Sequence, residues 1–253
     1  WTRSNTANYN FDIATDHHFT VLAGMELHKQ TKEESSAYAQ SFDLEDKDYM
    51  WPDAATGIRR SSGIGSGYTL ASFFGKVDYN WQDLLLASFT IRRDGSSRFG
   101  KNNRYGSFPA ATLGYRLSKN LKANWLDDLK IRASWGKTGN QEIANNARYG
   151  LYVADYGQDR VTSTAYDLYR QGTGVFPSGF RATQTANENL KWETTIQYNV
   201  GVDFSMFNQA LYGTVDGYIK DVKDMLISPA FLGAMGEGGN MWSNGPSLRN
   251  IGM

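Results

Sequence analysis

The sequence predicts an all-β fold, namely an antiparallel transmembrane β-barrel. Three observations predict it: strict two-residue alternation in long segments, connections that are alternately short and long, and aromatic residues near strand ends. The alternation is clearest in residues 192–205, where Ile196 and Phe204 lie at even positions and Gln197 and Asp203 at odd ones. Successive side chains of a strand point to opposite faces, so this segment has one apolar and one polar face.

The same alternation recurs along the chain and predicts nine strands. Residues 192–205 alone are about twice as long as the usual soluble strand, a length typical of strands that cross a bilayer. The expected strands cover residues 1–13, 18–29, 68–81, 84–94, 106–118, 128–138, 192–205 and 210–224, and a ninth begins near residue 247.

The connections between these segments alternate in length. The turns at residues 14–17 and 82–83 are short, whereas residues 30–67 and 139–189 form long polar stretches. In an up-and-down barrel, odd connections lie at one rim and even connections at the other, and outer-membrane barrels have short periplasmic turns and long external loops. We therefore expect the two long stretches to be external loops.

Aromatic residues gather at both ends of the expected apolar faces. Tyr79 and Trp81 lie at the short-turn end, and Trp1, Trp135 and Trp192 lie at the long-loop end. Two such rows predict the aromatic girdles that meet lipid headgroups. The alternative is a soluble β-protein with surface aromatics, but apolar faces exposed on so many strands would aggregate in water.

The composition excludes several classes of protein. The chain has 26 basic and 26 acidic side chains, so its net charge is zero and no nucleic-acid partner is implied. Cysteine is absent, which excludes disulfides and cysteine-based metal sites. No stretch approaches the roughly 18 apolar residues of a spanning helix. Because the chain opens inside an alternating segment without a leader, we expect a fragment of a longer protein.

Five stretches carry a family pattern: FFGKVDYNW (73–81), DGSSRFGKNNR (94–104), LKIRASWGKTGNQ (129–141), NENLKWETTIQYNVGVDF (187–204) and DGYIKDVKDMLI (216–227). In sequence and in order they resemble the SusC/RagA-type TonB-dependent outer-membrane transporters. Together they cover most of the chain beyond Tyr68. Several co-linear matches are more specific than any single motif.

The resemblance implies a fragment of a large barrel of about 22 strands with a plugged lumen, in the bacterial outer membrane and surrounded by membrane lipid. Residues 1–253 would all belong to the barrel domain, and the plug domain and the final strands would be absent from this chain. The implied function is import of a glycan or an oligopeptide, driven by the TonB–ExbB–ExbD complex and assisted by a SusD-like lipoprotein over the external mouth. An outer-membrane barrel enzyme or adhesin is the alternative.

Two groups of residues are candidates for contact with substrate. Loops held by a rigid scaffold often carry binding residues, and the second long stretch holds tyrosines that are candidates to stack on sugar rings or to contact the lid. The polar faces carry charged side chains that would point into the lumen, where they pair with one another or with the plug, or else line the substrate route. The tyrosines are Tyr149, Tyr152, Tyr156, Tyr166 and Tyr169, and the lumen candidates include Arg92, Asp94, Arg132 and Glu193.

No catalytic residue, cofactor or metal site is expected. The histidines His17, His18 and His28 have no acid at ligand spacing and no plausible nucleophile beside them. An acidic cluster in the first long stretch has the hard oxygens that calcium prefers, but it lacks the glycine and the distal glutamate of an EF-hand loop, so a solvated charge run is the simpler interpretation. The cluster consists of Asp43, Glu45, Asp46 and Asp48.

Overall fold

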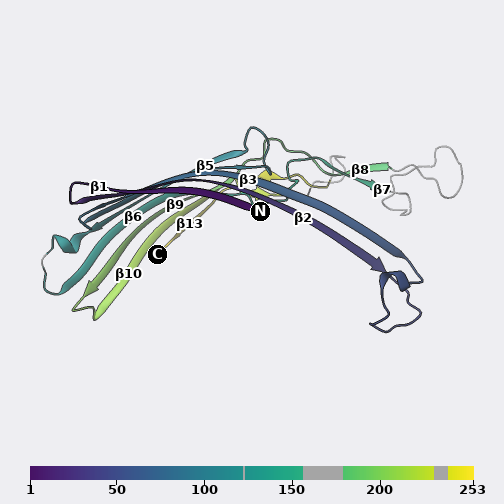
Figure 1. Cartoon of the computed structure of the whole chain (residues 1–253), viewed down its shortest axis with the longest axis horizontal. Coiled ribbons are helices and arrows are strands. Elements are labelled where there is room, and N and C mark those ends of the chain that lie inside the picture. The colour runs from purple at the N-terminus through teal and green to yellow at the C-terminus, as the bar shows by residue number, and fades with distance from the viewer. Residues whose placement is uncertain (122, 156–178, 231–238) are drawn as a thin grey trace.

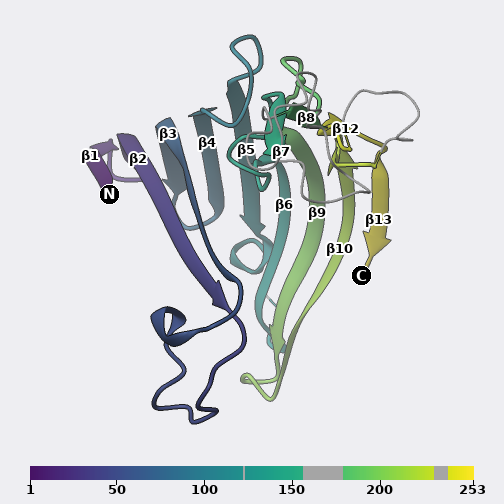
Figure 2. The same cartoon turned by 90° about the vertical axis from the view of Figure 1, so that its right-hand side faces the viewer.

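In the described part of the chain, nine strands form one antiparallel sheet in the order β1-β2-β3-β4-β5-β6-β9-β10-β13. The computed structural model describes residues 1–121, 123–155, 179–230 and 239–253. The sheet is a curved wall of strands lying side by side, with β1 at one edge and β13 at the other (Figures 1 and 2). The strands are β1 Thr2–Ile13, β2 His17–Ala39, β3 Arg59–Trp81, β4 Leu85–Ser96, β5 Tyr105–Arg116, β6 Leu126–Asn140, β9 Glu193–Met206, β10 Leu211–Lys223 and β13 Leu248–Gly252.

The predicted fold class and strand order are confirmed. Each expected segment is a strand, and neighbours in sequence pair antiparallel, except that β9 follows β6 and β13 follows β10 in the sheet. The short turns lie at one end of the sheet and the long connections at the other (Figure 1). The turn from β3 to β4 has positive φ at Gln82 (49°) and Asp83 (51°), the geometry of a type I′ hairpin turn. No helix in the described residues is long and apolar enough to cross a membrane.

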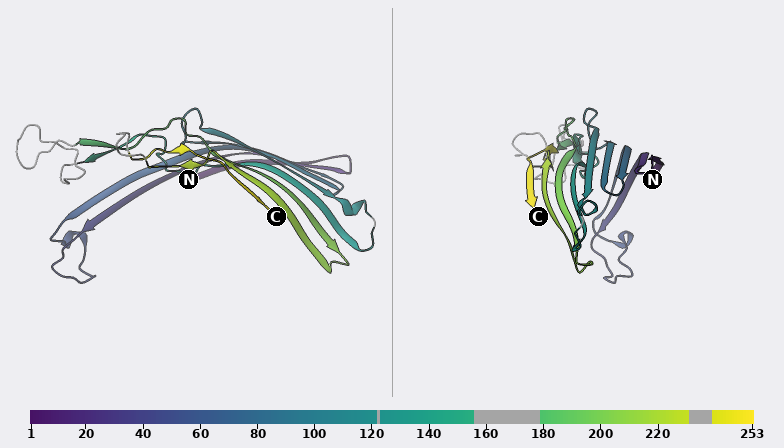
Figure 3. Two further views of the ribbon diagram at one scale, coloured as in Figure 1. Left: turned by 180° about the vertical axis from the view of Figure 1, so that it is seen from behind. Right: turned by 90° about the vertical axis from the view of Figure 1, so that its left-hand side faces the viewer.

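The prediction that residues 30–67 are loop throughout is wrong. Strands β2 and β3 continue as a hairpin far beyond their neighbours, from Gln30 paired with Tyr68 to Ala39 paired with Arg59 (Figure 3). Only residues 40–58 connect them, and they include the short 3₁₀ helix η1, Pro52–Ala54. Ladder hydrogen bonds do not require an apolar face, and this extension is polar on both sides, so hydrophobic alternation gave no signal for it.

The second long stretch also holds structure that alternation did not predict. Strands β7 (Leu151–Asp155) and β8 (Gly179–Gln184) pair as a small two-stranded sheet within it. A further pair, β11 (Leu226–Ile227) and β12 (Ser243–Asn244), lies in the connection from β10 to β13. The 3₁₀ helix η2, Leu117–Lys119, follows β5 at the short-turn end.

The register gives the main sheet two chemically distinct faces. One row across neighbouring strands joins Tyr79, Ala87, Leu113, Ala133 and Val200. We call this side the apolar face, and its large side chains are exposed: 50% for Leu113 and 60% for Val200. The opposite side, which we call the polar face, carries hydroxyls, amides and charges. Such a division is expected of a sheet that has lipid on one side and an aqueous lumen on the other.

The buried apolar core lies on the polar-face side, at the long-loop end. Phe108 and Leu70 of the polar face contact a cluster supplied mainly by the long connections. The prediction that Trp192 joins an outward girdle is therefore wrong: it is 7% exposed, and its Nε1 donates to the Arg104 carbonyl at 3.0 Å. The cluster consists of Phe99, Phe108, Ile143, Ala147, Leu190 and Trp192.

Candidate functional site

Arg92 organises the first charged group on the polar face. Its Nε donates to both carboxylate oxygens of Asp94 at 2.8 and 3.0 Å, and Nη2 donates to Ser72 Oγ at 2.9 Å. A Glu26 oxygen lies 3.7 Å from Nη2. Ser72 and Asp94 are directly opposite each other on β3 and β4, so the register alone brings these partners together. Ser72 and Asp94 are buried, and Arg92 is their charged partner.

Arg132 organises a second group that ties three strands together. From β6 its Nε donates to Asp203 of β9 at 3.1 Å, and its Nη2 donates to Asp216 of β10 at 2.7 Å. The guanidinium reaches Asp216 by passing over Gly201, which pairs with both Arg132 and Asp216. A Cβ at Gly201 would collide with Asp216 Oδ1 and lie 2.9 Å from Arg132 Cζ. A side chain at position 201 would therefore push the Arg132 and Asp216 side chains out of their present positions.

Glu193 links the long-loop end of β9 to strands β6 and β11. It accepts hydrogen bonds from Asn140 Nδ2 at 3.1 Å and from the backbone N–H of Leu226 at 3.0 Å. The four predicted lumen residues share one face but form three separate groups: Arg92 pairs with Asp94, whereas Arg132 and Glu193 each bind other neighbours. Their contact with substrate stays a prediction.

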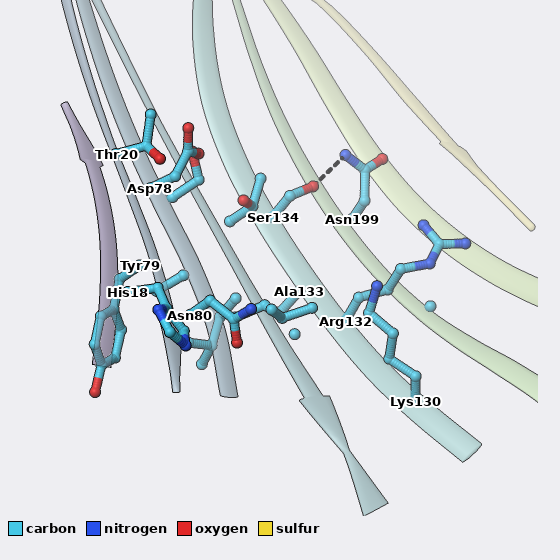
Figure 4. Close-up of a pocket in the computed structure, with 17 residues that line it drawn as sticks. His18, Thr20, Asp78, Tyr79, Asn80, Lys130, Arg132, Ala133, Ser134 and Asn199 are labelled. Atoms are coloured by element: carbon cyan, nitrogen blue, oxygen red, sulfur yellow. Dashed lines mark hydrogen bonds between the residues drawn. The ribbon is translucent and has the colours of Figure 1, made fainter. Parts of the chain in front are cut away.

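Between these charged groups, toward the short turns, the polar face is hollowed. The hollow has a volume of about 520 Å³, and Figure 4 shows polar side chains from several strands around it. Asn199 Nδ2 donates to Ser134 Oγ at 3.0 Å on one side, and Thr20 and Asn80 line the other. Strand parity places such residues on the polar face, but only the register shows that they surround one hollow.

The predicted tyrosines are described only in part. Tyr149 is 50% exposed, and the guanidinium of Arg148 lies 4.3 Å from its ring centre. Tyr152, on β7, is 69% exposed. Both lie at the long-loop end, whereas Tyr156, Tyr166 and Tyr169 are outside the described residues. The structure therefore leaves the ring of Tyr152 open to contact and does not test whether it stacks on a ligand.

The acidic stretch is held by local hydrogen bonds. Asp46 Oδ1 accepts the backbone N–H of Asp48 at 3.0 Å, and Thr56 Oγ1 donates to Asp43 Oδ1 at 3.4 Å. These side chains and that of Glu45 are exposed. In the described ranges, no group of three or more histidine or acidic side chains is placed to hold a metal ion.

The three histidines each contact a polar side chain. His18 Nδ1 lies 2.6 Å from Asp12 Oδ1, His17 Nδ1 lies 2.7 Å from the Tyr79 hydroxyl, and His28 Nδ1 lies 2.8 Å from Thr2 Oγ1. Each pair joins neighbouring strands. These contacts support the interpretation of the histidines as strand and turn polarity.

Comparison with known proteins places this geometry in a family. The family model for the TonB dependent receptor-like beta-barrel matches residues 1–252. The TonB-dependent receptor SusC of Bacteroides thetaiotaomicron is 38% identical over 202 residues, which are 78% of this chain and 19% of that protein. The TonB-dependent receptor P39 of Formosa agariphila is 31% identical over 225 residues, covering 88% of this chain and 20% of the relative.

A solved structure agrees with these relatives. The structure of the RagAB peptide transporter superposes with a TM-score of 0.82 at 28% identity, covering 99% of this chain and 26% of that one. The chain therefore spans about a fifth of the length of the curated relatives it matches and about a quarter of the solved chain.

Proposed function

Because the chain belongs to the TonB-dependent receptor-like β-barrel family, we propose that the whole protein is an active importer of nutrients, energised through TonB. The chain itself is a segment of an outer-membrane β-barrel. The observation that carries the proposal is the family match over residues 1–252 together with a sheet that is apolar on one face and polar on the other. We propose that the remainder of the whole protein supplies the plug domain and the other strands.

The partners follow from the same premise. A SusD-like lipoprotein would cover the external mouth, where the β2–β3 hairpin and the β7–β8 sheet lie, and the TonB–ExbB–ExbD complex would act from the periplasmic side. Membrane lipid would cover the apolar face, and no nucleic acid is involved. Co-purification of a SusD-like lipoprotein with the whole protein from outer membranes tests the first of these partners.

We propose a glycan or an oligopeptide as the substrate. RagAB is described as a peptide transporter, while exposed tyrosines such as Tyr152 suit the stacking of sugar rings as well as of peptide side chains. No enzymatic activity is proposed. Hydrolysis of lipid or peptide by the purified whole protein would favour the alternative of a barrel enzyme.

Uptake measurements test the import function. Cells that produce the whole protein should accumulate a labelled oligosaccharide or oligopeptide, and the same cells without TonB should not. Uptake that continues unchanged without TonB would indicate a passive channel and contradict the proposal. Accumulation of only one of the two labelled compounds would identify the substrate class.

One substitution tests the proposed tyrosine contact. Tyr152→Ala should weaken ligand binding several-fold, because a stacked ring contributes about 0.5–1.5 kcal/mol. Tyr212→Ala is the matched control, since Tyr212 is also exposed but is the second residue of β10, at the short-turn end. Equal affinity of the Tyr152 variant and the unmodified protein would remove Tyr152 from the binding surface.

A further inference from the structure

Strand β3 has a free edge where it extends beyond its neighbour β4. Pairing of β3 with β4 ends at Leu70 and Ser96, whereas pairing of β3 with β2 continues to Arg59. Figures 1 and 3 show this hairpin extending past the ends of β4 and β5. In the described part of the chain, no strand therefore lies beside residues 59–67 on the side that faces away from β2.

The last contact on that side shows which backbone groups face the free edge. The N–H of Ser97 donates to the Thr69 carbonyl at 3.0 Å, and the N–H of Thr69 donates to Ser97 Oγ at 2.9 Å. Every second residue of such a strand directs its N–H and C=O to the same side. The next residues to do so are Gly67, Gly65, Gly63 and Ser61. Among the described residues, these backbone groups have no hydrogen-bond partner on this side.

The free edge lacks the features that usually prevent a strand edge from pairing. Residues 61–67, SSGIGSG, contain no proline and no charged side chain, and their register with β2 has no bulge. All of them are exposed. A Cβ at Gly65 would have no neighbouring atom within 4 Å. A row of exposed backbone groups of this kind is a template for one more strand.

A hollow of about 320 Å³ lies where the free edge begins. Gly67, Asn145, Arg148 and Tyr149 are among the residues that line it. Asn145 Nδ2 donates to Ser66 Oγ at 3.2 Å, which ties this loop to β3. The Arg148 guanidinium lies over the Tyr149 ring at 4.3 Å and forms no ion pair with a carboxylate of the described residues. The hollow therefore offers a positive charge at one end of the free edge.

We propose that the free edge of β3 binds an oligopeptide substrate as an added strand, with the C-terminal carboxylate of the peptide in the hollow beside Arg148. This inference rests on the proposed import function. An extended peptide repeats its N–H and C=O groups every two residues, about 7 Å, as the edge does, whereas a glycan has no such repeat. Because β3 runs from the hairpin tip toward the hollow, the peptide would run parallel to β3.

The hollow favours a free peptide over a strand of the lid protein. A C-terminal carboxylate can accept charge-assisted hydrogen bonds from a guanidinium, whereas a strand inside a folded protein brings no chain terminus. Recognition through the backbone would also tolerate many peptide sequences.

Fluorescence anisotropy with the whole protein in detergent tests the inference. The probe is a nonapeptide of alternating alanine and threonine, labelled with fluorescein at its N-terminus. The double variant Gly63→Pro/Gly65→Pro removes two N–H groups that face the free edge and none that faces β2. It should bind the probe about tenfold more weakly, because each backbone hydrogen bond contributes severalfold to affinity.

Alanine at the same two positions is the matched control. Gly63→Ala/Gly65→Ala keeps both N–H groups, and its Cβ atoms would meet nothing closer than the Glu34 carbonyl oxygen at 3.6 Å. This variant should bind the probe as the unmodified protein does. Equal binding by the proline and alanine variants, or no binding of the probe by the unmodified protein, would overturn the site.

Changes to the probe test the same contacts on the unmodified protein, so the inference can be tested even if the proline variant does not fold. A nonapeptide that is N-methylated at every residue has lost its N–H donors and should bind about tenfold more weakly. Amidation of the C-terminus should weaken binding severalfold, because it removes the negative charge beside Arg148. Undiminished binding of the methylated peptide would overturn the strand pairing, and undiminished binding of the amidated peptide would overturn the position of the carboxylate.

One further result would identify a different occupant. If the proline variant bound the probe normally but no longer co-purified with a SusD-like lipoprotein, the free edge would pair with the lid, and the peptide site would be wrong. Binding in detergent does not require TonB, so the loss of this site would leave TonB-driven uptake of a glycan intact. The inference and the proposed function can therefore fail separately.

Discussion

The two faces of the sheet handle the same kinds of side chain in opposite ways. On the apolar face, Val200 and Leu113 are more exposed than most core residues of a soluble protein. On the polar-face side, Trp192 and Phe108 are buried in a core. Lipid would cover the first face under the proposed function, so that face needs no protein partner, whereas the polar-face side has an apolar cluster supplied mainly by the long connections. The difference teaches that solvent, rather than residue type, decides where packing is required.

Cations show the same contrast. Arg92 on the polar face has two acids and a hydroxyl within reach, whereas its neighbour Arg93, on the opposite face, has an aromatic ring and no acid in the described residues. Charges on the polar face thus pair across strands, whereas Arg93 on the apolar face is paired with an aromatic ring. Four substitution tests would break or sharpen this comparison, and the largest expected effect comes first.

Trp192→Ala should cost the most stability. It removes the largest ring of the buried cluster and its hydrogen bond to Arg104, and such truncations cost about 3–5 kcal/mol. Urea unfolding of the whole protein in lipid vesicles measures the loss. Trp135→Ala is the control, because Trp135 lies on the apolar face, where lipid can fill the space. Equal losses from the two variants would contradict the distinction between the faces.

Val200→Arg should destabilise the barrel through its lipid-facing position. A basic residue near the middle of the bilayer costs about 2–4 kcal/mol on the lipid face of such barrels. Asn199→Arg is the matched variant on the polar face of the same strand, and its cost should be clearly smaller because water remains available. Vesicle unfolding gives both values, and a larger cost for Asn199→Arg would reverse the assignment of the faces.

Arg92→Met should cost less, about 1–3 kcal/mol, because it leaves the buried Asp94 carboxylate without its charged partner. Arg93→Met, one position along the strand, should change stability by no more than about 0.5 kcal/mol in vesicles of uncharged lipid. The same unfolding assay compares them. If Arg93→Met proved the more harmful, pairing on the polar face would not contribute to stability.

Substitution of Asp83 should have the smallest effect on stability, because Asp83 lies in a turn and on neither face of the sheet. Its Oδ1 accepts from Asn80 Nδ2 at 2.8 Å, and this hydrogen bond, with Lys119 nearby, holds the pKa of the Asp83 carboxyl below its ordinary value. A lowered pKa stabilises the folded state above about pH 4, and that stabilisation is lost as the pH falls further. Asp83→Asn should reduce the fall in the free energy of unfolding that is measured as the pH is lowered from about 5 to 2. An unchanged pH dependence would show that the Asp83 carboxylate does not contribute measurably to stability.

Much of the fold could be predicted because a strand has a side-chain period of two. Where one face is apolar, as in residues 192–205, the alternation shows which side chains share a face, although it does not name the partner residues on the next strand. The parity of connection lengths fixed which end of the sheet carries the loops. Both predictions hold in the structure.

The candidate site was predictable only as a list of polar-face residues. Asp203 and Asp216 meet at Arg132 through the pairing of β6, β9 and β10, and β6 and β9 are far apart in sequence. The sequence around Arg132 does not identify these two aspartates as its partners. The residues around the polar hollow, such as Thr20 and Asn199, were missed for the same reason.

The sequence by itself determined the architecture, the two faces and the end at which loops gather, because these depend on local periodicity and on the order of segments. Only the tertiary structure decided the long β2–β3 hairpin, the burial of Trp192 and the partners of each lumen charge. Those features depend on backbone pairing without an apolar face, and on contacts between residues distant in sequence, for which a local pattern carries no information.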